Sequence, residues 1–159
     1  MDELRVGLLV AATLATGLFA GVFAFYAHTV MPALRRVDDR TFVDVYTLLD
    51  HAIVNPVFLS TTFLGAPVLT AAAAVASIGE DPFGWVLGAL GLQLLVIVVT
   101  GRFNLPRNDR LKAGATDPGR DDGALRSTFD ERGWVRANHV RALAGIASLG
   151  LLAGALTQA

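Results

Sequence analysis

Four long apolar blocks constrain this chain more than any other feature of its sequence. They cover approximately residues 6–30, 53–78, 83–103 and 138–157. Each block is long enough to cross a bilayer as an α-helix, for which about 20 apolar residues suffice. The sequence therefore predicts an all-α protein: a four-helix transmembrane bundle with up-down topology, formed by residues 1–159 as a single integral membrane domain.

Composition excludes several other classes of protein. The chain has no cysteine, which excludes disulfides, thiolate metal sites and cysteine nucleophiles. Its formal net charge is −1, so the charge balance does not indicate nucleic acid as a partner. The leader MDELR is acidic, and the apolar run behind it exceeds the core of a signal peptide, about 7–15 residues. We expect the first block to be retained as a helix.

The distribution of positive charge predicts the orientation in the cell membrane. Four spans place both termini on one side and the two long connections, 31–52 and 104–137, on the other. Of the thirteen Lys and Arg residues, only Arg5 lies on the terminal side. We therefore expect a multi-pass protein in the lipid bilayer, with both connections cytoplasmic and the N- and C-termini extracytoplasmic.

Two further patterns concern the packing of the helices. Residues 31–50 are amphipathic, which predicts a short interfacial helix after the first span. Glycine pairs at Gly-xxx-Gly spacing are typical of close helix packing within a membrane bundle, and a homo-oligomer formed through the same faces is the alternative. These pairs are Gly17 and Gly21, Gly84 and Gly88, and Gly150 and Gly154.

Polar residues gather at one end of the predicted spans. Up-down connectivity places all of them near the same membrane face, and polar groups in hydrocarbon normally turn toward the bundle interior or a wet cavity. They are His28, His51, Asn55, Asn104, Asn108, Trp134, Asn138, His139 and Arg141. Gln93 is the only strongly polar side chain in mid-span, and it is expected either to bond across helices or to line the cavity.

Spacing groups these polar residues on common helix faces. His51 and Asn55 lie at i and i+4, and a stripe at i, i+4 and i+7 follows in the fourth span, formed by Trp134, Asn138 and Arg141. Amide groups and a guanidinium aimed inward form a donor-rich pocket floor. Such a floor is suited to holding an oxygen atom that carries negative charge.

Pro106 stands between Asn104 and Asn108, which share the same i, i+4 spacing if the helix continues. Proline lacks an N–H donor and disfavours helix at the preceding residue, Leu105. The sequence therefore predicts that the third span kinks or ends here, at the mouth of a pocket.

Each polar residue also has a structural interpretation. Asn and His often cap helix ends, and Trp134 is typical of an aromatic belt at the membrane interface. A polar clasp between the third and fourth spans accounts for Asn104, Asn108, Asn138 and Arg141 without any chemistry.

Two motifs in this region resemble the DUF1772 family, the small four-helix membrane proteins that include the anthrone oxygenases. They are N-x-P-x-N-x-x-L (Asn104, Pro106, Asn108, Leu111) and W-x-x-x-N-x-x-R (Trp134, Asn138, Arg141). The resemblance covers nearly the whole chain. The front half agrees through Gly21, Phe23, Pro32, Leu34, His51 and the Asn55-Pro56 pair.

The resemblance implies a four-helix membrane protein and, for the anthrone oxygenase branch, oxidation of an anthrone to an anthraquinone by O₂. This reaction is expected to need no metal and no other cofactor, with O₂ as co-substrate. The branch carries His where this chain has Asn138, so either the base lies at His28, His51 or His139, or the chain does not share the activity.

A cofactor-independent monooxygenase needs a base, donors for an enolate oxygen, and an apolar slot for flat rings. We expect His28 or His51 as the base, because histidine titrates near neutral pH. Arg141 is expected to stabilise the oxyanion together with the side-chain amides. The substrate, a lipophilic (poly)aromatic or polyketide-type molecule, is expected to contact Asn55, Gln93, Asn104, Asn108, Trp134, Asn138 and His139, and phenylalanines of the first span (Phe19, Phe23, Phe25).

Two other classes of function stay open from the sequence. His28, His51 and His139 at one depth are also typical of a metal or haem protein with histidine ligands. Alternatively, the chain is a non-catalytic membrane subunit or small-molecule binding protein whose polar layer locks the bundle.

Overall fold

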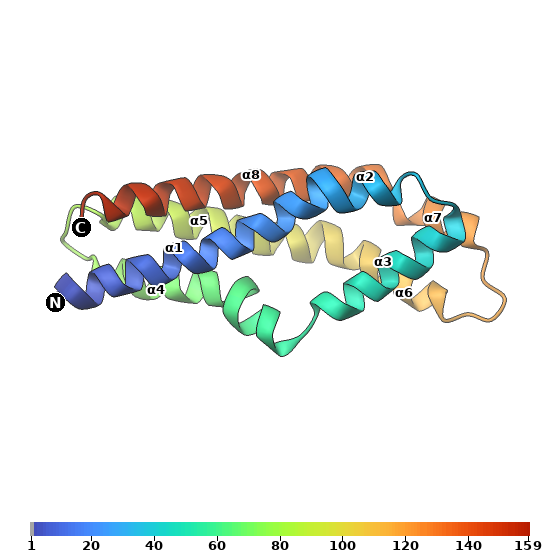
Figure 1. Cartoon of the computed structure of the whole chain (residues 1–159), viewed down its shortest axis with the longest axis horizontal. Coiled ribbons are helices and arrows are strands. Elements are labelled where there is room, and N and C mark those ends of the chain that lie inside the picture. The colour runs from blue at the N-terminus through green and yellow to red at the C-terminus, as the bar shows by residue number, and fades with distance from the viewer. Residues whose placement is uncertain (1) are drawn as a thin grey trace.

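The computed structural model, which describes residues 2–159, is an elongated bundle of four helical rods (Figure 1). Consecutive rods run in opposite directions. Both ends of the chain and the turn at 77–82 lie at one end of the bundle, and the connections at 35–38 and 116–121 lie at the other. The described residues form helices and no strand. The predicted all-α four-helix architecture is confirmed.

The first two rods differ in their continuity. The first is unbroken and consists of α1 (Asp2–Phe25), the π-helical segment η1 (Tyr26–Val30) and α2 (Met31–Leu34). The second is interrupted between its first two segments, and consists of α3 (Asp39–Ile53), the π-helical segment η2 (Phe58–Phe63) and α4 (Gly65–Ala76).

The third and fourth rods contain the remaining helices. The third consists of α5 (Phe83–Val99), the π-helical segment η3 (Thr100–Asn104) and α6 (Leu105–Ala115). The fourth consists of α7 (Asp122–Phe129) and α8 (Glu131–Leu156). Asp130 joins α7 to α8 and caps α8, because its Oδ1 accepts a hydrogen bond from the Gly133 N–H at 3.0 Å.

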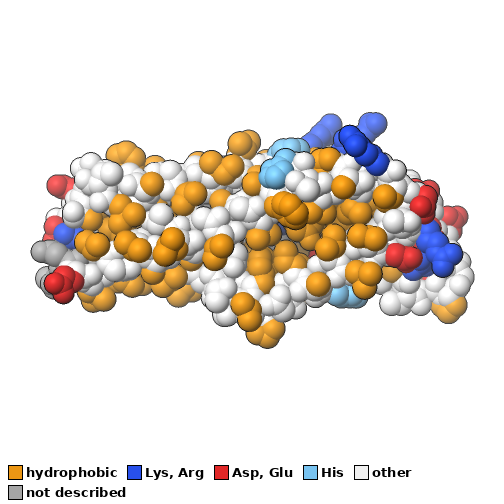
Figure 2. All heavy atoms as spheres, viewed as in Figure 1, with side chains coloured by type: hydrophobic (Ala, Val, Ile, Leu, Met, Phe, Trp, Pro, Cys, Tyr) orange, Lys and Arg blue, Asp and Glu red, His pale blue; other side chains and the backbone are white. Residues whose placement is uncertain are grey.

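Four helices are long and apolar enough to cross a membrane, as the sequence predicts. They are Glu3–Leu34, Phe58–Ala76, Phe83–Ala115 and Glu131–Leu156. Large hydrophobic side chains cover much of the outer surface (Figure 2), as expected for helices whose partner is lipid. The protein is therefore an integral membrane protein.

The helix predicted along the membrane interface is present as α3, but its apolar face packs against protein instead. Phe42, Val43 and Tyr46 are buried against residues of the other rods, including Leu111 and Trp134. Burial of these side chains fixes α3 as the first part of the second rod. This correction brings an additional helix into the polar end of the bundle.

The second rod is interrupted at residues 54–57. Val54 leaves the helical conformation (φ −82°, ψ 73°), and Pro56 follows. Asn55 caps the next segment, because its Oδ1 accepts a hydrogen bond from the Phe58 N–H at 2.9 Å. The rod bows away from the bundle at this break (Figure 1).

The end of the third span at Pro106, which the sequence predicted as the alternative to a kink, is not observed. The helix continues from Phe83 to Ala115. The π-helical segment η3 ends immediately before α6, with the Leu105 N–H bonded to the Thr100 carbonyl five residues earlier. Since proline is tolerated in the first turn of a helix, Pro106 fits at the second position of α6.

Gln93 closes the middle of the bundle. Its Nε2 lies 3.0 Å from each of three hydroxyl oxygens, those of Thr16 in α1, Thr70 in α4 and Ser148 in α8. All four side chains are fully buried. We call these four residues the Gln93 clasp. Gln93 thus bonds across helices, the first of its two expected roles.

The predicted glycine pairs do not all act as packing surfaces. A Cβ atom at Gly154 would approach the Trp85 ring to 2.8 Å, and one at Gly88 would approach Leu151 to 3.2 Å, so these two glycines hold α5 close to α8. A Cβ atom at Gly21, by contrast, would meet nothing within 4 Å.

Candidate functional site

Three rods change their helical geometry around one cavity. Residues of η1, η2 and η3 all line it, and the break at 54–57 lies beside it. π-Helical segments are rare and are frequent at functional sites, where they redirect side chains that a regular helix would align differently. The distortion of three rods at one level therefore marks this cavity as the candidate site.

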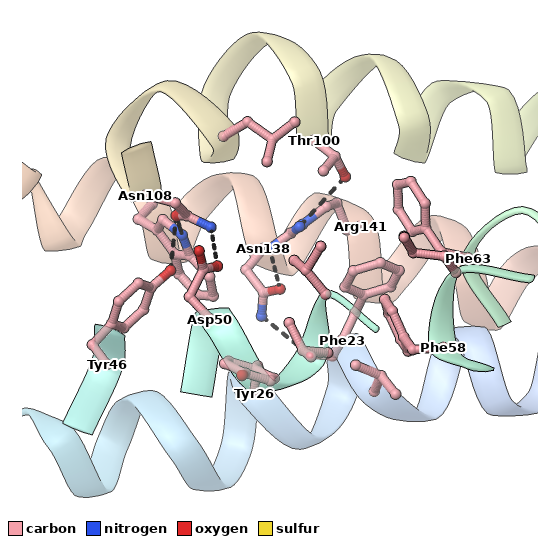
Figure 3. A pocket seen from close by; sticks show the side chains of 16 residues that line it. Phe23, Tyr26, Tyr46, Asp50, Phe58, Phe63, Thr100, Asn108, Asn138 and Arg141 are labelled. Carbon is pink, nitrogen blue, oxygen red and sulfur yellow. Dashed lines mark hydrogen bonds between the residues drawn. The ribbon is translucent and has the colours of Figure 1, made fainter. Parts of the chain in front are cut away.

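The cavity has a volume of about 290 Å³ and receives side chains from all four rods (Figure 3). This volume is at the lower end of the range for small-molecule sites, about 300–1,000 Å³. Its aromatic lining consists of Phe23, Tyr26, Tyr46, Phe58, Phe63 and Trp134. Its other polar lining consists of Asp50, Thr100, Asn108, Asn138 and Arg141.

Arg141 is buried in α8 with 6% of its surface exposed. Its Nη2 donates to Asn138 Oδ1 at 2.8 Å, and its Nη1 lies 3.4 Å from Thr100 Oγ1. The guanidinium lies over the rings of Phe23 and Trp134, 4.6 and 5.2 Å from their centroids. These contacts hold the cation between two aromatic walls.

No carboxylate among the described residues forms an ion pair with Arg141, and its buried Nε has no hydrogen-bond partner there. Asp50 lines the same cavity but forms its ion pair with Lys112. A buried cation that no carboxylate contacts directly is unfavourable unless another group compensates its charge. Arg141 is therefore suited to an anionic oxygen on a bound molecule.

Asn138 fixes the orientation of Arg141. Its Nδ2 donates to the backbone carbonyl of Phe23 at 3.0 Å, and its Oδ1 accepts from Arg141. The amide is fully buried and links α8 to α1, beside the cavity that Arg141 also lines. This bond also uses a carbonyl just before η1.

Asn108 is the centre of a second group of hydrogen bonds (Figure 3). Its Oδ1 accepts from Tyr46 Oη at 2.8 Å and from Trp134 Nε1 at 2.9 Å. Its Nδ2 donates to Asp50 Oδ1 at 2.7 Å. Three rods are thereby joined through one amide, and each of the four side chains also lines the cavity.

Asp50 is the one carboxylate among the described residues that line this cavity. Its Oδ2 lies 2.8 Å from Lys112 Nζ, and the same ammonium contacts the exposed Asp109 at 3.1 Å. Lys112 thus connects the buried carboxylate to the surface. Burial and the neighbouring Asp50 charge raise the pKa of the Tyr46 phenol well above its usual value, so this phenol stays a neutral donor.

The three histidines do not meet in this cavity. His28, His51 and His139 are exposed (Figure 2), and two of them bond locally, His28 Nδ1 to Thr29 Oγ1 and His139 Nδ1 to the Val135 carbonyl. Successive residues of an α-helix point about 100° apart, so a buried residue is followed by one that points elsewhere.

Two residues that immediately precede a histidine do line the cavity. They are Asp50, which precedes His51, and Asn138, which precedes His139. The expected base therefore does not come from a histidine in the cavity. The three histidines also do not form the ligand set that a metal or haem protein would need. No group of three His, Cys, Asp or Glu among the described residues is placed to hold a metal ion.

Three other candidate residues lie outside the cavity lining. Asn55 caps η2. Asn104 is fully buried and its Nδ2 donates to the Trp134 carbonyl at 3.3 Å, which ties η3 to α8. Gln93 belongs to the clasp in mid-bundle. Of the candidate residues named from the sequence, the structure brings together Phe23, Asn108, Trp134, Asn138 and Arg141, whereas Phe19 and Phe25 do not line the cavity.

The sequence interpretation missed Tyr46, Asp50 and Lys112 as site residues. Tyr46 and Asp50 are at i and i+4 on the buried face of α3. That spacing was a signal for a shared face, but α3 was expected at the membrane interface. Lys112 follows Asn108 by four residues on α6, which was expected to belong to the cytoplasmic connection 104–137.

Fold and site together define a small integral membrane bundle with an aromatic cavity at its polar end. A protein-family model described as "Anthrone oxygenase" matches residues 55–151, which is 97 of the 159 residues. The chain belongs to the anthrone oxygenase family, as its motifs indicated. No curated protein and no solved structure matches it in the corresponding searches. The matched segment contains Asn108, Trp134, Asn138 and Arg141, whereas Tyr46 and Asp50 precede it.

Proposed function

We propose that this protein binds a lipophilic polycyclic aromatic ketone of the anthrone type in the cavity and oxidises it with O₂. Arg141, buried against aromatic rings and without an ion-pair partner among the described residues, is the main support for this proposal. Membership of the anthrone oxygenase family is the second support.

The cavity accommodates the ligand through two kinds of contact. Phe23, Phe58, Phe63 and Trp134 offer flat apolar surfaces for fused rings. The carbonyl oxygen of the ligand points to the Arg141 guanidinium. This placement uses the cation that no carboxylate of the described residues contacts directly, and it positions the ligand oxygen beside a fixed donor.

The first chemical step is removal of a proton from the ring carbon opposite the carbonyl. The electron pair of that C–H bond moves into the ring system and onto the carbonyl oxygen, which becomes an enolate oxygen beside Arg141. Asp50 accepts the proton, because its carboxylate is the proton acceptor that lines the cavity. Asp50 replaces His28 and His51 in this role.

The second step is reaction of the electron-rich ring carbon with O₂. A C–O bond forms, and the resulting peroxide anion takes a proton from Asp50. Loss of the remaining hydrogen on that carbon, with cleavage of the O–O bond, leaves a carbonyl and releases water. One O₂ is consumed and one water is released for each quinone, so O₂ is the co-substrate and no external reductant or other cofactor is required.

We infer from the positive charge that the cavity end of the bundle faces the cytoplasm. Arg5, at the opposite end, forms an ion pair with Glu80 at 3.0 Å. The other twelve Lys and Arg residues are in the rods and connections at the cavity end or near it.

A second candidate function is binding of the same class of molecule without catalysis. The bonding of Asn108 favours it, because this amide joins Tyr46, Asp50 and Trp134 and so acts as a structural link. In this case the cavity would hold its ligand without consuming O₂.

The experiment that tests the proposal measures oxygen uptake and quinone formation by the purified protein in lipid nanodiscs with anthrone. We expect a rate well above autoxidation, with one O₂ consumed per quinone. Asp50→Asn is expected to lose this rate, while Asp109→Asn, which changes the exposed partner of Lys112, is the matched control and keeps it. A wild-type rate equal to autoxidation would reject the catalytic proposal and leave the binding function.

A further inference from the structure

A second hollow lies on the outer face of α1, beside the cavity. Its volume is about 430 Å³. Three residues line both spaces: Val22, Tyr26 and Ile53. The hollow therefore adjoins the cavity, with these three side chains between the two spaces. We call it the α1 groove.

Two glycines form the floor of the α1 groove. A Cβ atom at Gly21 would meet nothing within 4 Å, and one at Gly17 would meet only Leu149 Cδ1, at 3.9 Å. This Gly-xxx-Gly pair was expected to seal a helix–helix seam. Instead, because neither glycine has a side chain, the space beside the cavity stays open.

The remaining walls of the groove are apolar and face outward. Leu18 is 61% exposed and Phe25 is 51% exposed, and both belong to the membrane-spanning helix Glu3–Leu34. The groove therefore opens toward hydrocarbon. An apolar chain fits it, and a charged or strongly hydrated group does not.

We propose that the α1 groove holds an aliphatic chain carried by the same ligand whose aromatic rings occupy the cavity. This inference rests on the proposed function and narrows its substrate class to polycyclic ketones with an alkyl or isoprenoid-like substituent. The oxygen of the ring system lies beside Arg141, the rings lie between the aromatic walls, and the chain passes Val22 and Ile53 to lie over Gly21.

The shared wall favours this occupant over an independent one. A substituent on the rings reaches the groove if the side chains of Val22 and Ile53 turn aside, and both of these side chains are apolar. Because lipid tails are as apolar as the groove, the expected signature is steric fit rather than a gain in hydrophobic free energy. A bilayer acyl chain in the groove is the competing outcome of the test.

The test compares equilibrium binding of two probes, anthraquinone and 2-pentylanthraquinone, to the protein in nanodiscs. Wild type is expected to bind both with similar affinity, after correction for partitioning into lipid. Gly21→Leu fills the groove and is expected to weaken 2-pentylanthraquinone about tenfold, the usual scale of a steric clash in a packed site, and to leave anthraquinone unchanged. Gly21→Ala is expected to give a smaller loss in the same direction.

Gly91→Leu is the matched control. Gly91 is an exposed glycine of α5 where a Cβ atom also meets nothing within 4 Å, and it lines neither hollow. We expect this variant to bind both probes like wild type. Equal binding of the two probes by Gly21→Leu would overturn the inference and assign the groove to bilayer lipid. An equal loss of affinity for anthraquinone and 2-pentylanthraquinone in Gly21→Leu would also overturn it, because the groove would then contact the rings and not the chain.

Turnover of anthrone, measured on the same preparations, separates this inference from the proposed function. Oxidation of anthrone by every variant, with no effect of the pentyl chain, rejects the groove as a chain site and retains the function. Selective loss of 2-pentylanthraquinone in Gly21→Leu, without oxidation of anthrone by wild type, retains the groove and rejects the reaction.

Discussion

Two buried polar regions lie in the same bundle, and they differ in whether they surround a cavity and contain a charged group without an ion-pair partner. The Gln93 clasp joins three hydroxyl groups from three other helices. The group around the cavity, formed by Asp50, Asn108, Asn138 and Arg141, also joins several rods. Only the second region surrounds a cavity, and only there does a guanidinium lie without an ion-pair partner among the described residues.

The helices around the two regions differ in the same way. Near the clasp the rods are regular α-helices and the core contains small residues such as Ala12, Ala73 and Ala89. Around the cavity three rods become π-helical and the second rod is interrupted. Regular helices bring the small side chains into close contact, whereas the π-helical segments line the open cavity. The irregular backbone therefore distinguishes the polar residues of the candidate site from those of the clasp.

Replacement of Arg141 by Met is expected to have the largest effect. It keeps an unbranched apolar stem but removes the cation that is proposed to face the enolate oxygen. Turnover of anthrone should fall by roughly 10²–10³, the usual loss when an oxyanion donor is removed. Circular dichroism and a thermal melt check folding. An active Arg141→Met variant would make the cavity group a structural link like the clasp.

Replacement of Asp50 by Asn is expected to lower kcat by about 10²-fold or more, because it removes the proposed proton acceptor and keeps the side-chain shape. Affinity for anthraquinone, which has no proton to give, should be almost unchanged. Steady-state kinetics and equilibrium binding separate the two effects. Loss of binding together with kcat would assign Asp50 a role in holding the site together.

Gln93→Leu tests the opposite side of the comparison. Thr16 and Thr70 already donate to backbone carbonyls, at 2.7 and 2.8 Å, so they keep a partner when the amide is removed. We expect a loss of stability of about 1 kcal/mol, as for interhelical hydrogen bonds in membranes, and unchanged turnover. Unfolding in mixed detergent and anthrone oxidation measure the two quantities. A large loss of turnover would connect the clasp to the site.

The smallest expected effect concerns pH and Asp130, outside both regions. The hydrogen bond from Arg107, at 2.6 Å, and that from the Gly133 N–H hold the pKa of Asp130 below its usual value. The charged form therefore stabilises the fold above the unfolded-state pKa, about 4, and this contribution is lost as the pH falls through the lower folded-state pKa.

Asp130→Asn is the matched variant, because Asn also caps helices and tolerates the positive φ of this position, 52°. We expect it to melt slightly below wild type at pH 7, and the difference in Tm to close below about pH 4. Melting curves across this pH range check the sign. A difference that widens in acid would contradict the assigned cause.

Much of the fold follows from the sequence because lipid imposes a simple pattern. Four apolar blocks specify four spans, and a stripe at i, i+4 and i+7 turns Trp134, Asn138 and Arg141 to one face of α8. The motifs around Asn108 and Arg141 also indicated the family that the comparison then showed. These patterns lie within single helices, so they can be recognised in the sequence without knowledge of the neighbouring helices.

The parts that the sequence did not predict depend on contacts between rods. The direction of α3 is set by burial of Phe42 and Tyr46 against other helices, not by its own amphipathic pattern. Continuation through Pro106 depends on η3, and π-helical segments have no clear sequence signature here. On α3, Asp50 is buried and the next residue, His51, is exposed. His51 was predicted as the base because histidine is the usual type of residue for that role, but Asp50 is the one that lines the cavity.

The central claim is that the cavity stabilises the anion of an aromatic ketone beside Arg141. The most direct test is the absorption spectrum of anthrone bound to the purified protein without oxygen, at neutral pH. Wild type is expected to show the red-shifted band of the anthrone anion, and Arg141→Met is expected to show only the neutral form. A wild-type spectrum of neutral anthrone, identical to that of Arg141→Met at equal occupancy, would contradict the account.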